Sequence, residues 1–393
     1  MADTNVLIVG AGPVGLTTAL GLARSGVGVT VLEASDASVP GHHDMIYRAG
    51  TLAGLQRLGV LDDLLRAGLT SHRWRLQVRP TGEHIDFDLA SLADEIEHPY
   101  HLHLRSDRLA TAVLPHLSRH GHATVEWGTR VTGVEPDDHG VTVTAHGPDG
   151  PRTYRAAWVV GTDGAHSIVR RSVGLGFAGM TWPDRFVAVD SRFDWTEVGF
   201  VETNYQLDPE YPALAAKIDA TGLWRYIYAE NRTLPEATIA ERMPSVFKAV
   251  LPDGADPAIC GWSAYRVHER AADRFRVGRV VLAGDAAHVT NPTSSLGLAG
   301  GLFDSFVLTG ALAAVVHGEA DEAVLDRYAE TRRRVFLDVT SPLASRSMHL
   351  VFNSGDPAVL EAELEHYRRA ATDPALLREL HAETARLETP PLY

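Results

Sequence analysis

Apolar and polar residues follow two different periods along this chain, and these periods separate two kinds of segment. Residues 6–9 form a short unbroken apolar run, which is typical of a strand buried on both faces of a parallel sheet. Residues 16–25 carry apolar positions at helical spacing, and a second apolar run follows at 27–32. The pattern predicts a β-α-β unit at the start of the chain.

Two other segments, residues 73–97 and 179–271, alternate apolar and polar positions with period two. This alternation predicts strands with one covered face, here arranged as an antiparallel sheet. Trp224, Tyr226 and Tyr228 share one face of such a strand, and this aromatic stripe either packs as core or lines a pocket. The remaining pattern predicts amphipathic helices at residues 62–67 and 108–118 and a hairpin at 131–143. It also predicts a charged helical tail at 356–393.

A glycine-rich turn joins the first predicted strand to its helix. Gly10, Gly12 and Gly15 stand in the spacing G-x-G-x-x-G, with Pro13 and Val14 in the last interval. The first glycine permits a tight turn, the second lets a pyrophosphate approach the backbone, and the third allows the helix to pack closely on the strand. Free N–H groups at the helix N-terminus then bind the phosphate. The turn predicts a dinucleotide site.

Acidic residues follow three of the predicted strands. Glu33 ends the second strand, where a carboxylate binds ribose hydroxyls and repels a 2′-phosphate, so the tightly held nucleotide is FAD or NAD rather than NADP. Later strands end in Asp163-Gly164 and Gly284-Asp285. Singly, such a pair is a turn or a helix N-cap. After a dinucleotide turn, two of them predict a shared cleft at the carboxyl edge of one sheet.

Taken in order, these motifs resemble those of the class A flavoprotein aromatic hydroxylases, the para-hydroxybenzoate hydroxylase-like FAD monooxygenases. The resemblance extends from residue 6 to about residue 312. It implies that FAD is bound tightly but not covalently over the glycine-rich turn. It also implies that Arg48 lies by the cofactor phosphates and the nicotinamide donor, and that Arg105, at a helix start, contacts FAD. In the same way Asp163 and Gly164 would serve both FAD and NAD(P)H, and Gly284 with Asp285 would bind the ribityl chain or ribose.

The resemblance also covers the loop at residues 292–301 and a helix that we expect over 302–316. In the family this loop lies beside the pyrimidine edge of the flavin, where helix N-terminal donors stabilise the anionic reduced ring. This chain departs from the family there, because Ser295 and Ala299 replace the usual glycine and asparagine. Backbone donors survive both changes, but the asparagine contact does not. The loop residues implied in cofactor binding are Pro292, Gly297, Leu298 and Ala299.

The expected architecture is α/β, with a Rossmann-like FAD-binding domain, an inserted antiparallel-sheet substrate domain and C-terminal helices. The FAD-binding domain would be discontinuous, at residues 1–72, 98–178 and 272–350. The substrate domain would take residues 73–97 and 179–271, and the helical tail residues 351–393.

Composition restricts the chemistry further. The chain carries 36 basic and 50 acidic side chains, a formal charge of −14, which argues against a nucleic-acid partner. Its single cysteine, Cys260, rules out an internal disulfide and predicts a buried apolar thiol. Among 19 histidines, His42 with His43 and His101 with His103 fit structural or exposed positions better than a metal site. We expect no metal, no leader peptide and no membrane span, and hence a cytoplasmic protein.

The resemblance implies that NAD(P)H binds transiently, reduces FAD and leaves, because no second dinucleotide turn is present. A flavin C4a-hydroperoxide would then hydroxylate or epoxidise an aromatic, phenolic or polyketide-like molecule with O2. No catalytic residue is assigned, and the candidates for a proton path are Tyr205, Arg225, Tyr226, Tyr228 and His268. Two alternatives remain: a flavin-dependent halogenase, which the scarcity of lysine (Lys217 and Lys248) disfavours, and a non-catalytic FAD-fold binding protein. The sequence does not decide the substrate, NADH against NADPH, or the oligomeric state.

Overall fold

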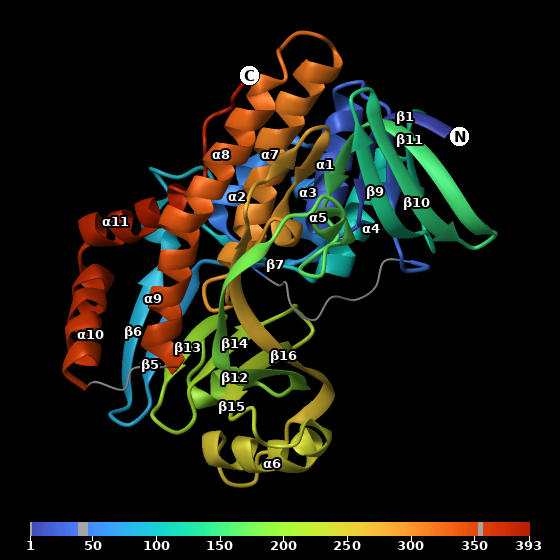
Figure 1. The fold of residues 1–393 in the computed structure, drawn as a ribbon. Coiled ribbons are helices and arrows are strands. Elements are labelled where there is room, and N and C mark those ends of the chain that lie inside the picture. The colour runs from blue at the N-terminus through green and yellow to red at the C-terminus, as the bar shows by residue number, and fades with distance from the viewer. Residues whose placement is uncertain (1, 38–45, 353–356) are drawn as a thin grey trace.

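The computed structural model describes residues 2–37, 46–352 and 357–393, so His42 and His43 lie outside the described residues. Figure 1 shows two large sheets, the first beside the long helices at the top and the second below it. Two long strands, β12 (Phe177–Arg192) and β16 (Ala258–Ala272), run from one region into the other. Segments distant in sequence therefore meet where the two sheets join.

The first sheet contains the predicted β-α-β unit. Its main path runs in the order β17 (Arg276–Val277), β18 (Val280–Leu282), β11 (Gly150–Gly161), β1 (Ala2–Val9), β2 (Val29–Leu32), β8 (Ala123–Glu126). The strands β18, β11, β1, β2 and β8 are parallel along this path. The loops after β1, β11 and β18 therefore reach one edge of the sheet, as the three motif-bearing strand ends predicted. The predicted hairpin is present as β9 (Arg130–Asp137) and β10 (Gly140–Gly147).

Helices cover the first sheet and form the main hydrophobic core with it. They include α1 (Pro13–Arg24), α3 (Leu61–Ala67), α4 (Ser106–Leu117), α7 (Leu296–Val316) and α8 (Ala323–Val335). Helix α7 starts at residue 296, earlier than the expected 302, so much of the cofactor loop is the first turns of a helix. By length and composition α7 is apolar enough to cross a membrane, but 72% of its most apolar window is buried inside the protein, as in a core helix.

The second sheet has the order β19 (His288–Val289), β16, β12, β15 (Leu223–Glu230), β14 (Ala213–Lys217), β13 (Thr203–Leu207), β5 (Arg73–Val78), β6 (Glu83–Asp88). It is antiparallel except between β13 and β5, which are parallel. Trp224, Tyr226 and Tyr228 pack in a core cluster with Met243 and Phe247 of α6 (Ile239–Val250). The aromatic stripe is therefore core and does not line a pocket.

The C-terminal residues form α9 (Ser341–Phe352), α10 (Pro357–Thr372) and α11 (Pro374–Ala385). Helix α10 lies against β6, and Arg368 Nε donates to Glu83 Oε1 at 2.6 Å. Leu364, Tyr367 and Leu377 are buried in the same contact, so the tail closes one side of the second sheet. A small third sheet has the strand order β3 (Ile46–Tyr47), β7 (His101–His103), β4 (Leu69–Ser71). Helix α2 (Ala49–Arg57) follows β3 in the sequence.

Cys260 does not occupy the buried position that the sequence predicted. It lies near the start of β16, where the residues from Ala258 to Cys260 are exposed. The expectation was wrong because this end of the strand extends beyond the covered part of the second sheet.

Candidate active site

The glycine-rich turn has the geometry that its spacing predicted. Gly10 has φ +102°, and a Cβ there would lie 2.6 Å from the carbonyl oxygen of Thr162. A Cβ on Gly15 would lie 2.0 Å from the carbonyl oxygen of Gly10, so this glycine lets α1 pack on the strand. By contrast, a Cβ on Gly12 would meet no protein atom within 4 Å. Pro13 starts α1 in the position where its missing N–H costs nothing.

Beside this turn is a cavity that we call the nucleotide cavity. Its lining includes Gly10, Gly12, Glu33, Asp163 and His166. The Glu33 carboxylate accepts from the backbone N–H of Ala11 at 2.8 Å, which fixes the carboxylate at the edge of the cavity. The acid and the open side of the glycine turn thus face one space, as a nucleotide site requires.

Asp163 has both of the roles considered for a strand-end aspartate. Its carboxylate accepts from Ser167 Oγ at 2.6 Å and from the backbone N–H groups of Ile168 and Val169 at 2.7 and 3.2 Å. It therefore caps α5 (Ile168–Ser172) while lining the nucleotide cavity. Burial raises the pKa of the Asp163 carboxyl, and these donors oppose that rise. Gly164 follows with φ +79°, which a side chain disfavours.

A second cavity, the flavin-side cavity, shares His166 with the first. It is lined by the third motif and the loop before α7, including Asp285, Pro292, Ser295, Gly297 and Leu298. The Asp285 side chain is accessible to this cavity, yet the surrounding protein raises the pKa of its carboxyl. Within the described parts of the chain, no group donates a hydrogen bond to the Asp285 carboxylate, so its oxygens remain available to a ligand.

Packing fixes the third motif against the first. Gly284 has φ +58°, and a Cβ there would lie 2.8 Å from Val14 Cγ2. Val14 therefore acts as a packing residue for Gly284. Ala299 is buried in another cluster, against Phe303, and does not line the flavin-side cavity.

Asp304 of α7 supports the third motif, and the sequence analysis missed it. It is fully buried and accepts from Gly284 N at 3.0 Å, with His288 Nε2 at 2.7 Å from the same oxygen. Its other oxygen accepts from Arg332 Nε at 2.7 Å. Burial opposes ionisation, but the facing His288 and Arg332 hold the pKa of the Asp304 carboxyl well below its usual range. The available signal was a single charged residue within the sequence of residues 296–316.

Ser295 occupies a strained position at the start of α7. Its φ is +54°, and among the described non-glycine residues it alone has positive φ. The left-handed region favours glycine, and glycine is the residue that the family usually has here. The substitution noted in the sequence therefore keeps the backbone shape at a conformational cost.

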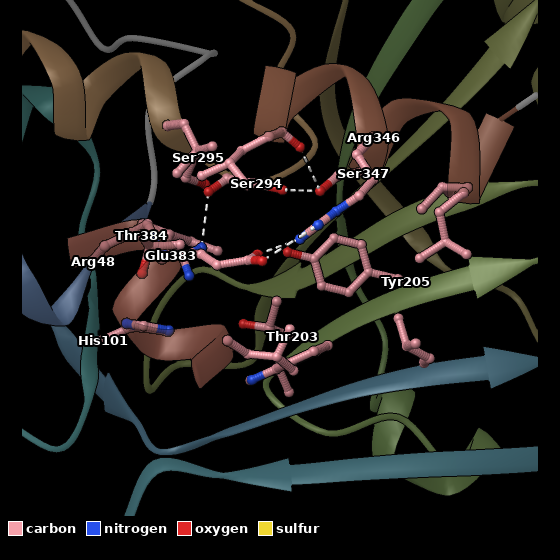
Figure 2. Close-up of a pocket in the computed structure, with 18 of the residues that line it drawn as sticks. Arg48, His101, Thr203, Tyr205, Ser294, Ser295, Arg346, Ser347, Glu383 and Thr384 are labelled. Carbon is pink, nitrogen blue, oxygen red and sulfur yellow. Dashed lines mark hydrogen bonds and ion pairs between the residues drawn. The ribbon is translucent and has the colours of Figure 1, made fainter. Parts of the chain in front are cut away.

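A third space, the substrate cavity, lies where α2, β13, the loop before α7 and the C-terminal helices meet (Figure 2). Its polar lining includes Arg48, His101, Thr203, Tyr205, Ser294, Arg346 and Glu383. Apolar and aromatic side chains complete the walls, among them Trp74, Leu76, Leu296, Leu343 and Tyr367. A cavity that combines apolar and aromatic walls with convergent polar groups is typical of a small-molecule site.

Arg48, which the resemblance placed by the cofactor phosphates, lines neither the nucleotide cavity nor the flavin-side cavity and is the cation at the α2 side of the substrate cavity. Its Nη1 donates to the carbonyl oxygen of Ser294 at 2.9 Å, and within the described parts of the chain no carboxylate pairs with it. Burial lowers the pKa of the Arg48 guanidinium, and nearby Tyr205 opposes this. Burial likewise raises the pKa of the Tyr205 hydroxyl, while Arg48 and Ser294 act against the rise. The cavity thus holds a positive charge beside a phenolic hydroxyl.

His101 adds a fixed donor to the same cavity. Its Nδ1 accepts from the backbone N–H of Ala49 at 3.0 Å, so the proton of the neutral ring is on Nε2. Burial first, and the nearby Arg48 second, hold the pKa of His101 well below its usual range. His101 therefore remains a neutral hydrogen-bond donor.

The other sequence candidates lie away from the substrate cavity. Tyr226 and Tyr228 belong to the core under α6, and Arg225 is buried against Asp190, with 2.6 Å between Nε and Oδ1. His268 lines the flavin-side cavity. Arg105 precedes α4, where its Nε donates to Asp107 Oδ1 at 3.1 Å, and it lines none of the three cavities.

Metal ligation has no support in the described residues, since no group of three or more His, Cys, Asp or Glu side chains converges there.

Comparisons with known proteins agree with this geometry. Residues 3–341 match the FAD binding domain family. The chain is 42% identical over 349 residues to 6-hydroxy-3-succinoylpyridine 3-monooxygenase HspB of Pseudomonas putida (strain DSM 28022 / S16), covering 88% of this chain and 89% of that protein. It is 38% identical over 386 residues to para-nitrophenol 4-monooxygenase of Pseudomonas sp. (strain WBC-3), covering 97% and 95%. The crystal structure of p-nitrophenol 4-monooxygenase PnpA from Pseudomonas putida DLL-E4 matches with a TM-score of 0.94 at 37% identity, covering 98% and 99% of the two chains.

The fold and the cavities therefore define a flavoprotein monooxygenase that acts on aromatic molecules. This chain belongs to the FAD binding domain family, as a class A FAD-dependent aromatic hydroxylase. The residues present fit FAD, because Gly12 leaves open space at a helix N-terminus and two acids face the two cavities that share His166. The relatives give no support to the halogenase or the non-catalytic alternative.

Proposed function

We propose that this enzyme hydroxylates a single-ring phenol or hydroxylated N-heteroaromatic molecule, bound as its anion in the substrate cavity. The observation that carries the proposal is Arg48, a half-buried cation without a carboxylate partner among the described residues, beside Tyr205. A partly desolvated cation without a counter-ion is costly, and an anionic ligand lowers that cost. The names of the relatives, a hydroxypyridine and a nitrophenol monooxygenase, support a single ring.

For FAD we propose a position across the nucleotide and flavin-side cavities. Gly10, Gly12 and Gly15 with the start of α1 would hold the diphosphate, and Glu33 the ribose. Asp285 would hold the ribityl chain, supported by its free carboxylate oxygens. Backbone donors at Pro292, Gly297 and Leu298 would lie along the ring. Arg105, Gly164 and Ala299 line neither cavity, so their proposed contribution is indirect.

When bound, FAD supplies the redox chemistry that activates dioxygen after reduction by NAD(P)H, which would bind transiently. The protein's own residues act on the substrate. A free phenol has a pKa of about 10, so the positive field of Arg48 and the His101 Nε2–H donor favour the phenolate, the stronger nucleophile. The apolar walls exclude water, which limits wasteful loss of the activated oxygen.

The pairing of strands supports the proposed domain division. Strands β5 and β6, within residues 73–97, pair with β13 of the second sheet, while residues before and after them build the first and third sheets. We propose the FAD-binding domain at 1–72, 98–178 and 272–350 and the substrate domain at 73–97 and 179–271. The tail at 351–393 contributes Tyr367 and Glu383 to the substrate cavity. A cytoplasmic location, where NAD(P)H is supplied, belongs to the same proposal.

The test compares the FAD-loaded enzyme with Tyr205→Phe. We expect single-ring phenols such as 4-nitrophenol to stimulate NAD(P)H and O2 consumption and to receive one oxygen atom from O2 on the ring, with release of nitrite where the nitro-bearing carbon is attacked. Loss of one hydrogen bond to an anion lowers kcat/KM by about 10- to 100-fold in Tyr205→Phe, with FAD content unchanged. NAD(P)H consumption that no phenol or hydroxypyridine stimulates would overturn the proposal.

A further inference from the structure

The substrate cavity contains a second guanidinium, and this one is neutralised. Arg346 of α9 and Glu383 of α11 both line the cavity, and Figure 2 shows their side chains pointing toward each other. Arg346 Nη2 donates to Glu383 Oε2, and Nη1 lies 3.5 Å from Oε1. The arginine thus meets the carboxylate with both terminal nitrogens.

We infer that Glu383 is a specificity-determining residue that makes the enzyme reject substrates carrying a carboxylate on the ring. The inference rests on the proposed function, since it concerns the molecule bound beside Tyr205. By occupying Arg346, Glu383 removes the cation that would bind a second anionic group. Its own charge repels such a group. Rings whose remaining substituents are polar but uncharged, such as nitro or acyl groups, meet neither penalty.

The charges that line the cavity support this reading. Arg48 and Arg346 contribute two positive charges and Glu383 one negative charge, which leaves a net charge of +1. That excess matches one phenolate and leaves no cation for a second anion. Specificity is the difference between the affinities for two ligands. The Arg346–Glu383 ion pair and the repulsion from Glu383 both lower the affinity for a ring with a second anionic group, and thereby raise the specificity for a phenolate with a single charge.

Arg346 retains a donor that its partner does not satisfy. Its Nε is buried and has no hydrogen-bond partner among the described residues. A purely structural ion pair between α9 and α11 would gain from satisfying this donor as well, since buried donors are usually paired. The pair is also only partly covered, with side-chain exposures of 40% and 35%. A ligand carboxylate could therefore reach Arg346 once Glu383 is neutral.

The experiment uses two probes of nearly equal size, 4-hydroxybenzoate and 4-hydroxyacetophenone, which differ by a carboxylate oxygen in place of a methyl group. Binding constants and kcat/KM are measured for the FAD-loaded wild type, Glu383→Gln and Glu383→Ala. The selectivity ratio is kcat/KM for 4-hydroxybenzoate divided by kcat/KM for 4-hydroxyacetophenone. Freeing Arg346 should raise this ratio by about 10- to 100-fold, the range of one charge-assisted hydrogen bond. Glu383→Ala must shift the ratio in the same direction, which guards against a folding defect in one variant.

Two controls assign the effect to Arg346. The double variant Arg346→Gln/Glu383→Gln should return the ratio to near the wild-type value. Glu95→Gln, which breaks the ion pair of Glu95 with Arg378 of α11 away from this cavity, should leave the ratio unchanged. An unchanged ratio in both Glu383 variants, with 4-hydroxyacetophenone still hydroxylated, would overturn the inference alone. If neither probe nor any other phenol is turned over by the wild type, the proposed function fails instead.

Discussion

Gly12 and Gly15 belong to one turn, yet their missing side chains serve different ends. A Cβ on Gly15 would overlap the Gly10 carbonyl oxygen, whereas a Cβ on Gly12 would point into empty space. Gly15 is therefore small because of the fold, whereas the fold places no such steric demand on Gly12. Ser295 shows the opposite case, since the chain keeps the left-handed backbone that suits glycine while carrying a side chain.

This difference gives a prediction for Gly12→Val. Because no protein atom lies within 4 Å of the added Cβ, the variant should fold with wild-type stability but lose bound FAD, as its side chain fills the space for the diphosphate. Bound flavin is measured by the absorbance of the purified protein. The matched control is Gly310→Ala, at an exposed position of α7 where an added Cβ also meets no protein atom within 4 Å. This variant should keep FAD and gain about 0.5–1 kcal/mol of stability. Full flavin occupancy in Gly12→Val would contradict the assignment of this turn.

At the scale of elements, the buried carboxylate of Glu269 joins the second sheet to the loop before α7 and to α9. Glu269 of β16 accepts from Trp182 Nε1 of β12 at 2.8 Å and from Asn291 Nδ2 at 2.7 Å. Its other oxygen accepts from Ser341 and Ser345 at 2.9 and 2.6 Å. Asn291 Oδ1 in turn accepts from the backbone N–H of Thr293 at 3.1 Å, so Glu269 helps to place the loop that precedes α7.

Replacing this carboxylate should weaken both stability and cofactor binding. In Glu269→Ala the Trp182 Nε1–H and Asn291 Nδ2 donors both lose their acceptor, and each buried donor left unsatisfied costs about 1–3 kcal/mol. We expect a lower urea midpoint and a weaker FAD affinity, measured by titration of the flavin-free protein. Ser345→Ala, which removes one donor only, should cost about 1 kcal/mol and serves as the control. Equal urea midpoints for Glu269→Ala and the wild type would show that the carboxylate does not join these elements.

At the scale of the whole molecule, His103 of β7 ties the third sheet to the second. Its Nδ1 donates to the carbonyl oxygen of Lys217 at 2.6 Å, and Thr203 Oγ1 lies 3.2 Å from Nε2. The ring is fully buried, and this burial lowers the pKa of His103 although the Lys217 contact opposes it. Both nitrogens are satisfied in the neutral form, and burial opposes the charge of the protonated ring.

The sign of the pH dependence follows from that lowered pKa. The unfolded chain, with a histidine pKa of about 6.5, binds more protons than the folded protein at lower pH, so stability falls as the pH drops below about 6.5. One such histidine contributes at most about 1.4 kcal/mol per pH unit, and His101 acts in the same direction. In His103→Asn the urea midpoint should vary less with pH between 6.5 and 5 than in the wild type. In His139→Asn, which changes an exposed histidine, the pH dependence of the midpoint should stay as in the wild type. An unaltered slope in His103→Asn would exclude this residue as the cause.

A feature of this protein could be predicted from the sequence when the residues that form it are close together in the chain. The glycine turn, Glu33 and the acids after β11 and β18 are local, because strand, turn and helix are adjacent in sequence and their spacing reflects one mechanical task. The parallel order of β1, β11 and β18 followed from those strand ends. Asp304 and Glu269 could not be found in this way, because their partners come from elements distant in sequence.

The sequence by itself determined the cofactor class, the Rossmann-like sheet and the alternation of the second sheet, because these follow from periodicity and from contiguous motifs. Only the tertiary structure decided which side chains surround the substrate. Period two assigned Tyr226 and Tyr228 to one face but not to a core or a pocket, and the packing of α6 made that face core. The cavity instead joins Arg48, Tyr205 and Glu383 from three distant elements. No spacing in a sequence encodes such a meeting, since it depends on how helices and sheets pack.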